Sequence, residues 1–292
     1  MTWEPAETKL TGGRSKTTCR RAPAARPPDA RKPAPPPPTP PGDPPSAPDP
    51  APLLENPCSA AFLGFTPDAR QCSLLGRPIH RLLLNCTRQW GKSTITAAQA
   101  VARADRHDGS LTVVVSPSAR QSAEFLRKAQ AFVRRLGIKP RGDGDTEISL
   151  AFPNGSRIVG LPGNEGTIRG FSSVSLMLID EAARVSDDMY ASVRPMLAVA
   201  DGDLWLMSTP YGKRGFFWQE WENGGPQWER MSVPATDCPR IRPEFLEEER
   251  ASLGERWFRQ EYLCEFLEDH DGLFSRDLID RAFCPDVTPL FS

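Results

Sequence analysis

The chain lacks the features that mark secreted, membrane-spanning or zinc-stabilised proteins. None of its apolar runs approaches the roughly 18 residues that a membrane span requires. Residues 1–5 contain no basic region followed by an apolar stretch, so we expect no secretory signal. The seven cysteines include no Cys-x-x-Cys pair, and the three histidines lie near no cysteine cluster. We therefore expect reduced thiols in a cytosol, without a disulfide framework, a zinc site or a membrane partner.

The chain also has almost no net charge. Its 36 Lys and Arg residues balance 37 Asp and Glu residues, which leaves a formal charge of −1. Total charge therefore does not indicate a nucleic-acid partner, and any DNA contact must come from a local patch. The length of 292 residues is enough for one or two domains.

Large apolar residues are scarce in the first part of the chain, where prolines are concentrated. Residues 1–57 cannot bury enough surface to offset their ordering entropy, so we expect a disordered Pro-rich tail with partly polyproline-like conformation. The tail leans basic up to Lys32. It is either a docking or DNA-touching arm or an inert extension, and the second interpretation is favoured because charge runs are usually just solvated.

From about residue 58 the pattern becomes that of an α/β protein, with strand and helix candidates in alternation. Apolar and β-branched runs predict strands at 82–85, 111–116, 175–180 and 204–208. Helical spacing predicts helices at 93–106, 118–136, 186–198 and 214–221. A hairpin is predicted between 148–152 and 157–161, around a Pro-Asn-Gly turn.

Two short helices are predicted at 243–253 and 255–266, which would pack against the sheet or form a small lid. This segment is acidic and carries aromatic residues that we expect to pack in a core. They are Phe245, Trp257, Phe258, Tyr262 and Phe266.

The most informative segment is 86–93, Cys-Thr-Arg-Gln-Trp-Gly-Lys-Ser, between an apolar run and a helix start. It is typical of a phosphate-binding loop, with cysteine at the usual first glycine. Backbone N–H groups and helix-end partial charge would together bind a polyphosphate. Lys92 would reach its β- and γ-phosphates, and Ser93 would hold Mg²⁺. The residues predicted to contact nucleotide here are Cys86, Thr87, Arg88, Gln89, Trp90, Gly91, Lys92, Ser93 and Thr94.

A Gly-Lys-Ser triplet arises often by chance, so an ordinary loop without a ligand remains an alternative interpretation until a partner motif is found. The partner is an apolar strand, 175–179, that ends in Asp180 and Glu181. Asp180 can hold Mg²⁺ through water or Ser93, and Glu181 can orient and deprotonate an attacking water. A buried strand with a helix-capping Asp is the plain alternative. Because ligands of such sheets bind beyond the carboxyl ends of strands, the two motifs together predict binding of ATP and Mg²⁺.

The ordered motifs resemble the ATPase domain of the large terminase subunit of tailed bacteriophages, over residues 60–280. Segment 88–94 resembles the family's modified Walker A motif, and 178–182 resembles its Walker B motif. The Leu-Met-Ser-Thr-Pro run at 206–210 matches its coupling motif. Segment 66–71 resembles the stretch whose glutamine contacts adenine, and 168–170 holds an arginine just before the Walker B strand.

The resemblance implies a P-loop NTPase core at 58–240, with a mostly parallel sheet flanked by helices, followed by a helical lid or linker at 241–292. It implies that Arg88 lies over the γ-phosphate or links ATP state to motion, and that Arg169 is an arginine finger for a neighbouring subunit. Gln71 would read adenine, while Ser208 and Thr209 would sense the γ-phosphate. Each of these residues also has a plain interpretation, as a solvated loop arginine, a helix residue or the end of a strand before proline.

The function implied by the resemblance is a DNA-packaging motor in the cytoplasm of a bacterial host. It would hydrolyse ATP to drive duplex DNA into a procapsid, as a homo-oligomeric ring with a portal protein and a small terminase subunit. Full-length relatives continue into a nuclease domain. We expect no nuclease domain and no nuclease activity in this polypeptide. Two alternatives stay open: another nucleic-acid-dependent P-loop ATPase resembling a helicase, or an inactive prophage remnant. The catalytic residues would be Glu181, Lys92, Arg88 and Arg169.

Overall fold

The computed structural model describes residues 56–139, 149–163 and 170–268, and within them seven strands form one sheet. The strand order is β3-β4-β2-β5-β6-β1-β7, and every neighbouring pair is parallel except β3 with β4. The strands are β1 Arg81–Cys86, β2 Leu111–Ser116, β3 Ser149–Ala151, β4 Arg157–Pro162, β5 Leu176–Asp180, β6 Asp203–Ser208 and β7 Glu229–Val233. The mostly parallel sheet and the β3–β4 hairpin that the sequence predicts are confirmed.

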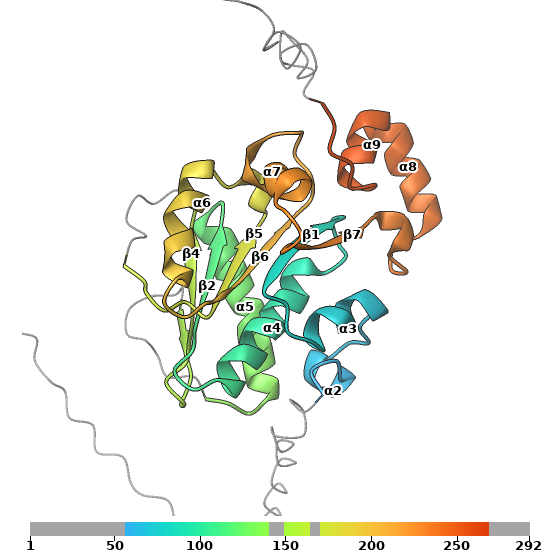
Figure 1. Ribbon diagram of the computed structural model, residues 1–292. Helices are drawn as coiled ribbons and strands as arrows, with labels where there is room; N and C mark the ends of the chain where they lie inside the picture. The colour runs from blue at the N-terminus through green and yellow to red at the C-terminus, as the bar shows by residue number, and fades with distance from the viewer. Residues whose placement is uncertain (1–55, 140–148, 164–169, 269–292) are drawn as a thin grey trace, which may run out of the picture. The chain divides into compact units, whose positions relative to one another are not determined.

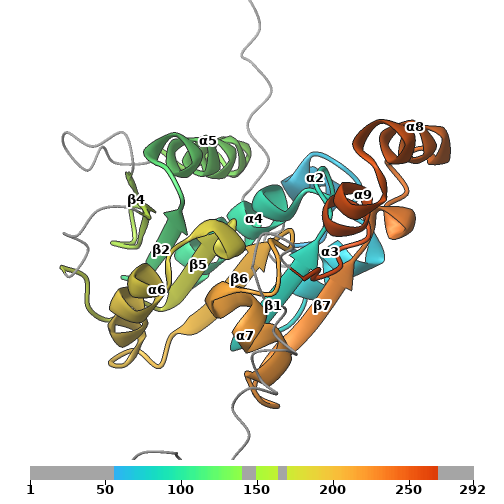
Figure 2. The ribbon, with the colours of Figure 1, turned by 90° about the horizontal axis from the view of Figure 1, so that it is seen from above.

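Helices cover both faces of this sheet (Figure 2). One face carries α3 (Ala69–Leu75), α4 (Lys92–Arg106) and α5 (Ala119–Arg135), with α2 (Ala60–Leu63) beside them. The other face carries α6 (Asp187–Val193) and α7 (Gly215–Asn223). Helices α8 (Pro243–Leu253) and α9 (Glu255–Glu261) lie beyond the β7 edge (Figure 1). Among the helices of the described ranges, none is long and apolar enough to cross a lipid bilayer.

The middle residues of the central strands are mostly apolar because each of these strands packs on both faces. Leu82 and Leu84 of β1 join the core under α4 and α5, while Leu83 points into the core under α6 and α7. The parallel register brings the carboxyl ends of β1, β6 and β5 to the same edge of the sheet. Asn85 lies opposite Ser208, and Asp180 lies opposite Met207. Polar residues that follow these strands are therefore brought to one edge of the sheet.

Two predicted helices are too long. The α-helix expected at 186–198 ends at Val193 and continues as a 3-10 helix, Arg194–Leu197, because Pro195 lacks the N–H that an α-helical bond needs. The helix expected at 255–266 ends at Glu261. Beyond it the chain turns back to the sheet, where the Tyr262 carbonyl accepts the Ala235 N–H at 2.7 Å.

The expectation that the aromatic residues near the C-terminus all pack in a core is wrong for two of them. Phe258 is buried in a small cluster with Ala235 and Leu246, but 38% of Phe245 and 52% of Trp257 is exposed.

Strand β7 was not predicted, because its residues alternate between partly buried and exposed positions and include no apolar run.

The central strand β5 supplies a test of the core. Leu178 of this strand is fully buried, whereas 44% of Leu253 at the end of α8 is exposed. We expect Leu178→Ala to lower the free energy of unfolding by about 2–5 kcal/mol, because it leaves a cavity between packed layers. The matched change Leu253→Ala should shift it by about 0.5 kcal/mol or less. Urea denaturation measures both, and equal effects of the two substitutions would contradict this placement of the core.

Candidate nucleotide-binding site

The candidate phosphate loop, residues 87–91, connects the end of β1 to the start of α4. Two of its residues have left-handed backbone, Gln89 with φ of 65° and Gly91 with φ of 97°. A Cβ atom at Gly91 would also lie 3.3 Å from Gln71 Nε2, so a side chain there would meet both strain and crowding. Gly91 directly precedes Lys92, the first residue of α4. The first N–H groups of a helix have no intrahelical partner, so this turn is suited to an anion.

The two predicted motifs meet at this loop. Lys92 Nζ lies 2.7 Å from Glu181 Oε1, and Ser93 Oγ donates a hydrogen bond to Asp180 Oδ2 at 2.8 Å. The second Asp180 oxygen, Oδ1, accepts the Glu181 N–H at 3.1 Å. The lysine and serine of the loop are therefore in direct contact with the acid pair at the end of β5.

Glu181 has two features that are characteristic of functional positions. Its backbone is left-handed, with φ of 53°, a conformation that costs a non-glycine residue free energy. Its Oε2 atom is buried and has no hydrogen-bond partner among the described residues. One carboxylate oxygen therefore pairs with Lys92, while the other is an acceptor that a bound water could use.

Burial and charge act against each other in this cluster. Burial raises the pKa of the Asp180 carboxyl, and the nearby Lys92 ammonium partly offsets the rise. Burial by itself lowers the pKa of Lys92, but neighbouring anionic groups, Glu181 foremost, outweigh it and the net pKa is raised. Lys92 is therefore held as an ammonium by carboxylates, and a phosphate group could take their place as its partner.

An open pocket of about 270 Å³ lies over the loop. Its lining residues include several of those predicted from the motifs, together with one residue of α5 that no motif contains. They are Arg88, Gln89, Gly91, Lys92, Ser93, Thr94, Lys128 and Glu181. Lys128 was missed because a single lysine in an amphipathic helix resembles any solvated charge.

Three predicted contact residues do not line this pocket, because their side chains hold the loop from beneath. Cys86 is fully buried as the last residue of β1, and burial raises the pKa of its thiol to about 12. Thr87 Oγ1 donates to the Glu261 carbonyl at 3.1 Å. Trp90 is buried, and its indole Nε1 donates to Asp68 Oδ2 at 3.0 Å.

Gln71 also contacts the loop. Its Nε2 donates to the Trp90 carbonyl at 2.9 Å, and its Oε1 accepts the Asp68 N–H at 3.1 Å. Arg240 donates to the same Trp90 carbonyl at 2.6 Å. Both polar ends of the Gln71 amide thus have protein partners, and its adenine-reading role stays a prediction. The Asp68 capping box that begins α3 is a sequence signal that could have predicted this helix.

Two further predicted residues, Ser208 and Thr209, are also absent from the pocket lining. Ser208 Oγ accepts the Ala183 N–H at 3.2 Å, which joins the end of β6 to the turn after β5. Thr209 Oγ1 is buried without a hydrogen-bond partner among the residues that the structure describes. Arg169 lies outside the described residues.

Arg88 is paired with a residue that sequence reasoning missed. Its Nε donates to Glu261 Oε2 at 2.6 Å, and Arg184 lies 3.7 Å from the other oxygen of this buried carboxylate. Glu261 is the last residue of α9, and its pairing raises the pKa of Arg88. The segment that follows is bound to β1, because Asn85 Nδ2 donates to the Cys264 carbonyl at 2.8 Å.

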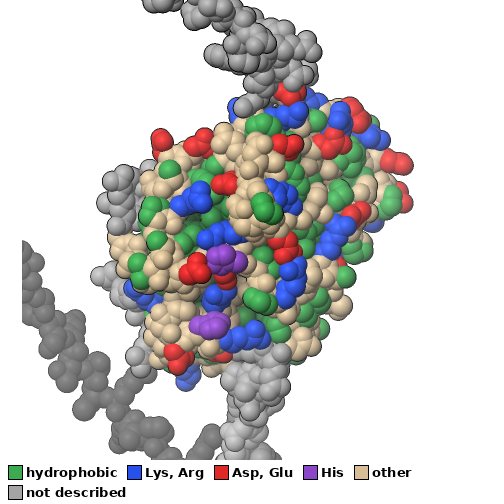
Figure 3. Space-filling view, in the orientation of Figure 1, with side chains coloured by type: hydrophobic (Ala, Val, Ile, Leu, Met, Phe, Trp, Pro, Cys, Tyr) green, Lys and Arg blue, Asp and Glu red, His purple; other side chains and the backbone are tan. Residues whose placement is uncertain are grey.

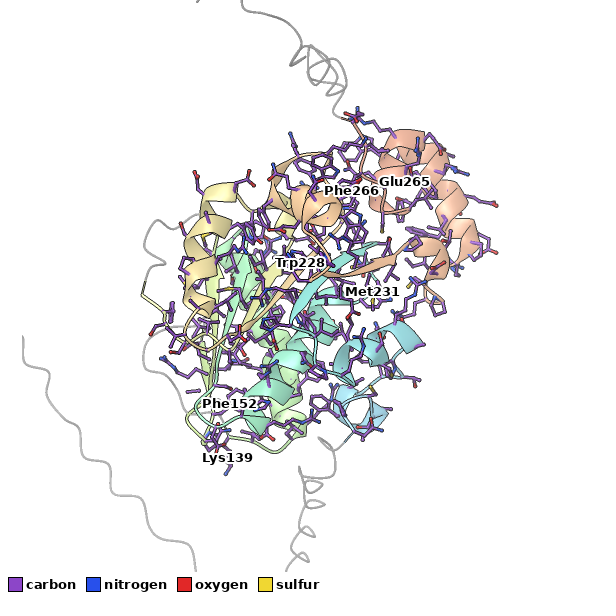
Figure 4. The ribbon with its side chains drawn as sticks, viewed as in Figure 1. Lys139, Phe152, Trp228, Met231, Glu265 and Phe266 are labelled. Carbon is purple, nitrogen blue, oxygen red and sulfur yellow. The ribbon has the colours of Figure 1, made fainter. Side chains whose placement is uncertain are left out.

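The same C-terminal segment packs on α7. Phe266 lies beside this helix, with its ring centroid 5.9 Å from that of Phe217 and 5.8 Å from that of Trp221 (Figure 4). The stretch after α9 therefore connects the phosphate loop, the sheet edge and α7.

The side-chain oxygen atoms beside the loop are suited to coordinate a divalent cation that also binds phosphate oxygens. In the described part of the chain, no three His, Cys, Asp or Glu side chains gather as a metal cluster. Mg²⁺ is commonly held by only one or two carboxylates together with substrate phosphates. The Ser93 hydroxyl and Asp180 carboxylate, already in contact at 2.8 Å, are oxygen donors of that kind.

Comparison with known proteins gives consistent results. Residues 83–281 match the family model "Terminase large subunit, T4likevirus-type, N-terminal". The chain is similar to the large terminase subunit of Thermus phage G20c, with 25% identity over 248 residues, which cover 73% of this chain and 51% of that protein. The large terminase subunit of Escherichia phage T5 is also 25% identical, with coverages of 70% and 48%. The chain thus spans about half the length of these curated relatives.

Solved structures show the same fold. The large terminase ATPase domain of Thermus phage P74-26 matches with a TM-score of 0.63 and 22% identity, covering 71% of this chain and 97% of that one. The large terminase of a thermophilic bacteriophage, solved in complex with ATP-gamma-S, matches with a TM-score of 0.56 and 12% identity, covering 65% and 48%. With the family match extending over more than half of its length, the chain belongs to the terminase large subunit family of the T4likevirus type, of which it contains the N-terminal part.

Proposed function

We propose that this chain is the ATP-hydrolysing motor domain of a phage DNA-packaging terminase, and that it drives duplex DNA into a procapsid. The observation that carries the proposal is the convergence of Lys92 and Ser93 on Asp180 and Glu181 at one pocket. Support also comes from family membership and from the thermophilic bacteriophage terminase, a protein of the same fold that was solved with ATP-gamma-S.

In this proposal the triphosphate of ATP binds over residues 87–93. Lys92 exchanges its Glu181 partner for a phosphate oxygen, which leaves the Glu181 carboxylate to orient and deprotonate the attacking water. Ser93 and Asp180 would hold Mg²⁺, whose charge would offset that of the phosphates. The Lys92–Glu181 pair keeps one oxygen of the glutamate occupied until a nucleotide supplies another anion for the lysine.

Arg88 offers a route from the nucleotide to the C-terminal segment. It lines the pocket, and its guanidinium bonds to Glu261 at the end of α9. A γ-phosphate that attracted Arg88 would weaken this bond and leave Glu261 with Arg184, its more distant partner at 3.7 Å. The segment that holds Asn85 and packs on α7 would then be free to shift. This coupling is the link between ATP state and motion.

The proposed partners are duplex DNA, a portal protein, a small terminase subunit and further copies of this chain in a ring, in the cytoplasm of a bacterial host. On the face shown in Figure 3, basic and acidic side chains are interspersed. DNA contact on that face would therefore use individual basic residues and not a broad single-signed surface. Of the two alternatives, an inactive remnant is disfavoured by the intact contacts of Lys92, Ser93, Asp180 and Glu181.

Glu181→Gln tests the assignment of the general base. The amide cannot take a proton from water, so hydrolysis should fall by about 10²–10⁴-fold while ATP still binds. Phosphate release and equilibrium nucleotide binding measure the two effects. Glu222→Gln, at an exposed position of α7, is the matched control and should leave both unchanged. Normal turnover in Glu181→Gln would remove Glu181 from its assigned role.

Gln71→Ala separates adenine reading from loop positioning. If Gln71 acts by holding the Trp90 carbonyl, the substitution should weaken the binding of ATP and of GTP by the same factor. We expect this factor to be about ten-fold, because a buried hydrogen bond is lost and the loop rearranges. Asp68→Ala, which removes the other partner of this network, should behave similarly. Competition binding with ATP and GTP measures the ratio. A selective loss of ATP binding in Gln71→Ala alone would instead establish the adenine contact.

A further inference from the structure

Helix α5 brings one lysine to the candidate nucleotide pocket. Lys128 is partly buried and lines this pocket together with Ser93, Thr94 and Glu181. It lies three residues after Phe125 and four before Phe132, two buried residues of the helix. On an α-helix this spacing places all three on neighbouring positions of one face. Since α5 packs beside α4, Lys128 lies at the edge of the apolar face next to the first turn of α4.

Lys128 differs from the other cationic side chains of the pocket in its bonding partners. Arg88 bonds to Glu261, and Lys92 bonds to Glu181. Lys128 has no ion pair or hydrogen bond with any residue of the described ranges. The start of α4 adds positive partial charge to the same place. Lys128 therefore lacks a directly bonded partner, and a phosphate group that entered the pocket would supply one beside the helix N-terminus.

We propose that Lys128 is a further binding residue of this site, whose ammonium contacts the terminal phosphate of a bound nucleoside triphosphate. This inference rests on the proposed function. Lys128 comes from the helix after β2, and β2 borders β5, the strand that ends in Asp180 and precedes Glu181. Its position on the side of the acid pair is supported by the pocket lining, which it shares with Glu181. Glu181 is the group proposed to deliver water to the terminal phosphate, so Lys128 approaches that phosphate and not the α-phosphate.

The experiment compares the binding of ATP-gamma-S and ADP to the full chain by calorimetry. Lys128→Met keeps roughly the length of the side chain and removes its charge. It should weaken the binding of ATP-gamma-S by about ten-fold or more, because a charge-assisted hydrogen bond is lost. ADP has no terminal γ-phosphate and should change by about two-fold or less. Lys128→Arg should recover part of the ATP-gamma-S affinity. Arg127→Met removes a neighbouring exposed charge, paired with Glu124, and should affect neither nucleotide.

Unchanged ATP-gamma-S affinity in Lys128→Met would overturn the inference. So would an equal loss for ATP-gamma-S and ADP, because it would assign Lys128 to the shape of the pocket. Lys92→Ala separates these results from a failure of the proposed function. If Lys92→Ala weakens both nucleotides while Lys128→Met weakens neither, the nucleotide site stands and the role of Lys128 falls. If the unmodified chain binds neither nucleotide, both fall.

Discussion

The contact between Lys92 and Glu181, 2.7 Å long, is the interaction on which the rest of the site depends. Its two residues come after strands that are not neighbours, because β6 lies between β1 and β5. They can meet only because all three strands are parallel and end at the same edge of the sheet. The sheet therefore serves to align two chemical groups that are 89 positions apart in the chain, from 92 to 181.

The phosphate loop is supported from behind by groups that never reach the pocket. The buried Trp90 indole bonds to Asp68, and the Trp90 carbonyl accepts bonds from Gln71 and Arg240. The position of Cys86 shows why a glycine is not required at the first position of this loop. It is still part of β1, has no left-handed backbone, and places its side chain in the core, so no conformational freedom is needed there. The glycine that the geometry requires is Gly91, whose φ is 97°.

Sequence patterns predicted the strands and helices that contain regular runs of apolar residues. They failed for elements and residues whose positions are determined by tertiary packing. Strands β1, β2, β5 and β6 were found because two-sided burial gives each of them a run of mostly apolar residues. Strand β7 was missed because pairing with β1 is enough to form it, and only its last residue, Val233, is buried. In the site, Lys92, Ser93, Asp180 and Glu181 have motif spacing. Glu261 and Lys128 have none, since helices α9 and α5 bring them to the loop only through packing.

The most direct test of this account is a crystal structure of the chain with ATP-gamma-S and Mg²⁺. We expect the triphosphate over residues 87–93, with the Lys92 ammonium moved from Glu181 to a phosphate oxygen and the Glu181 carboxylate facing water. A nucleotide bound elsewhere, with the Lys92–Glu181 contact intact at 2.7 Å, would contradict the account.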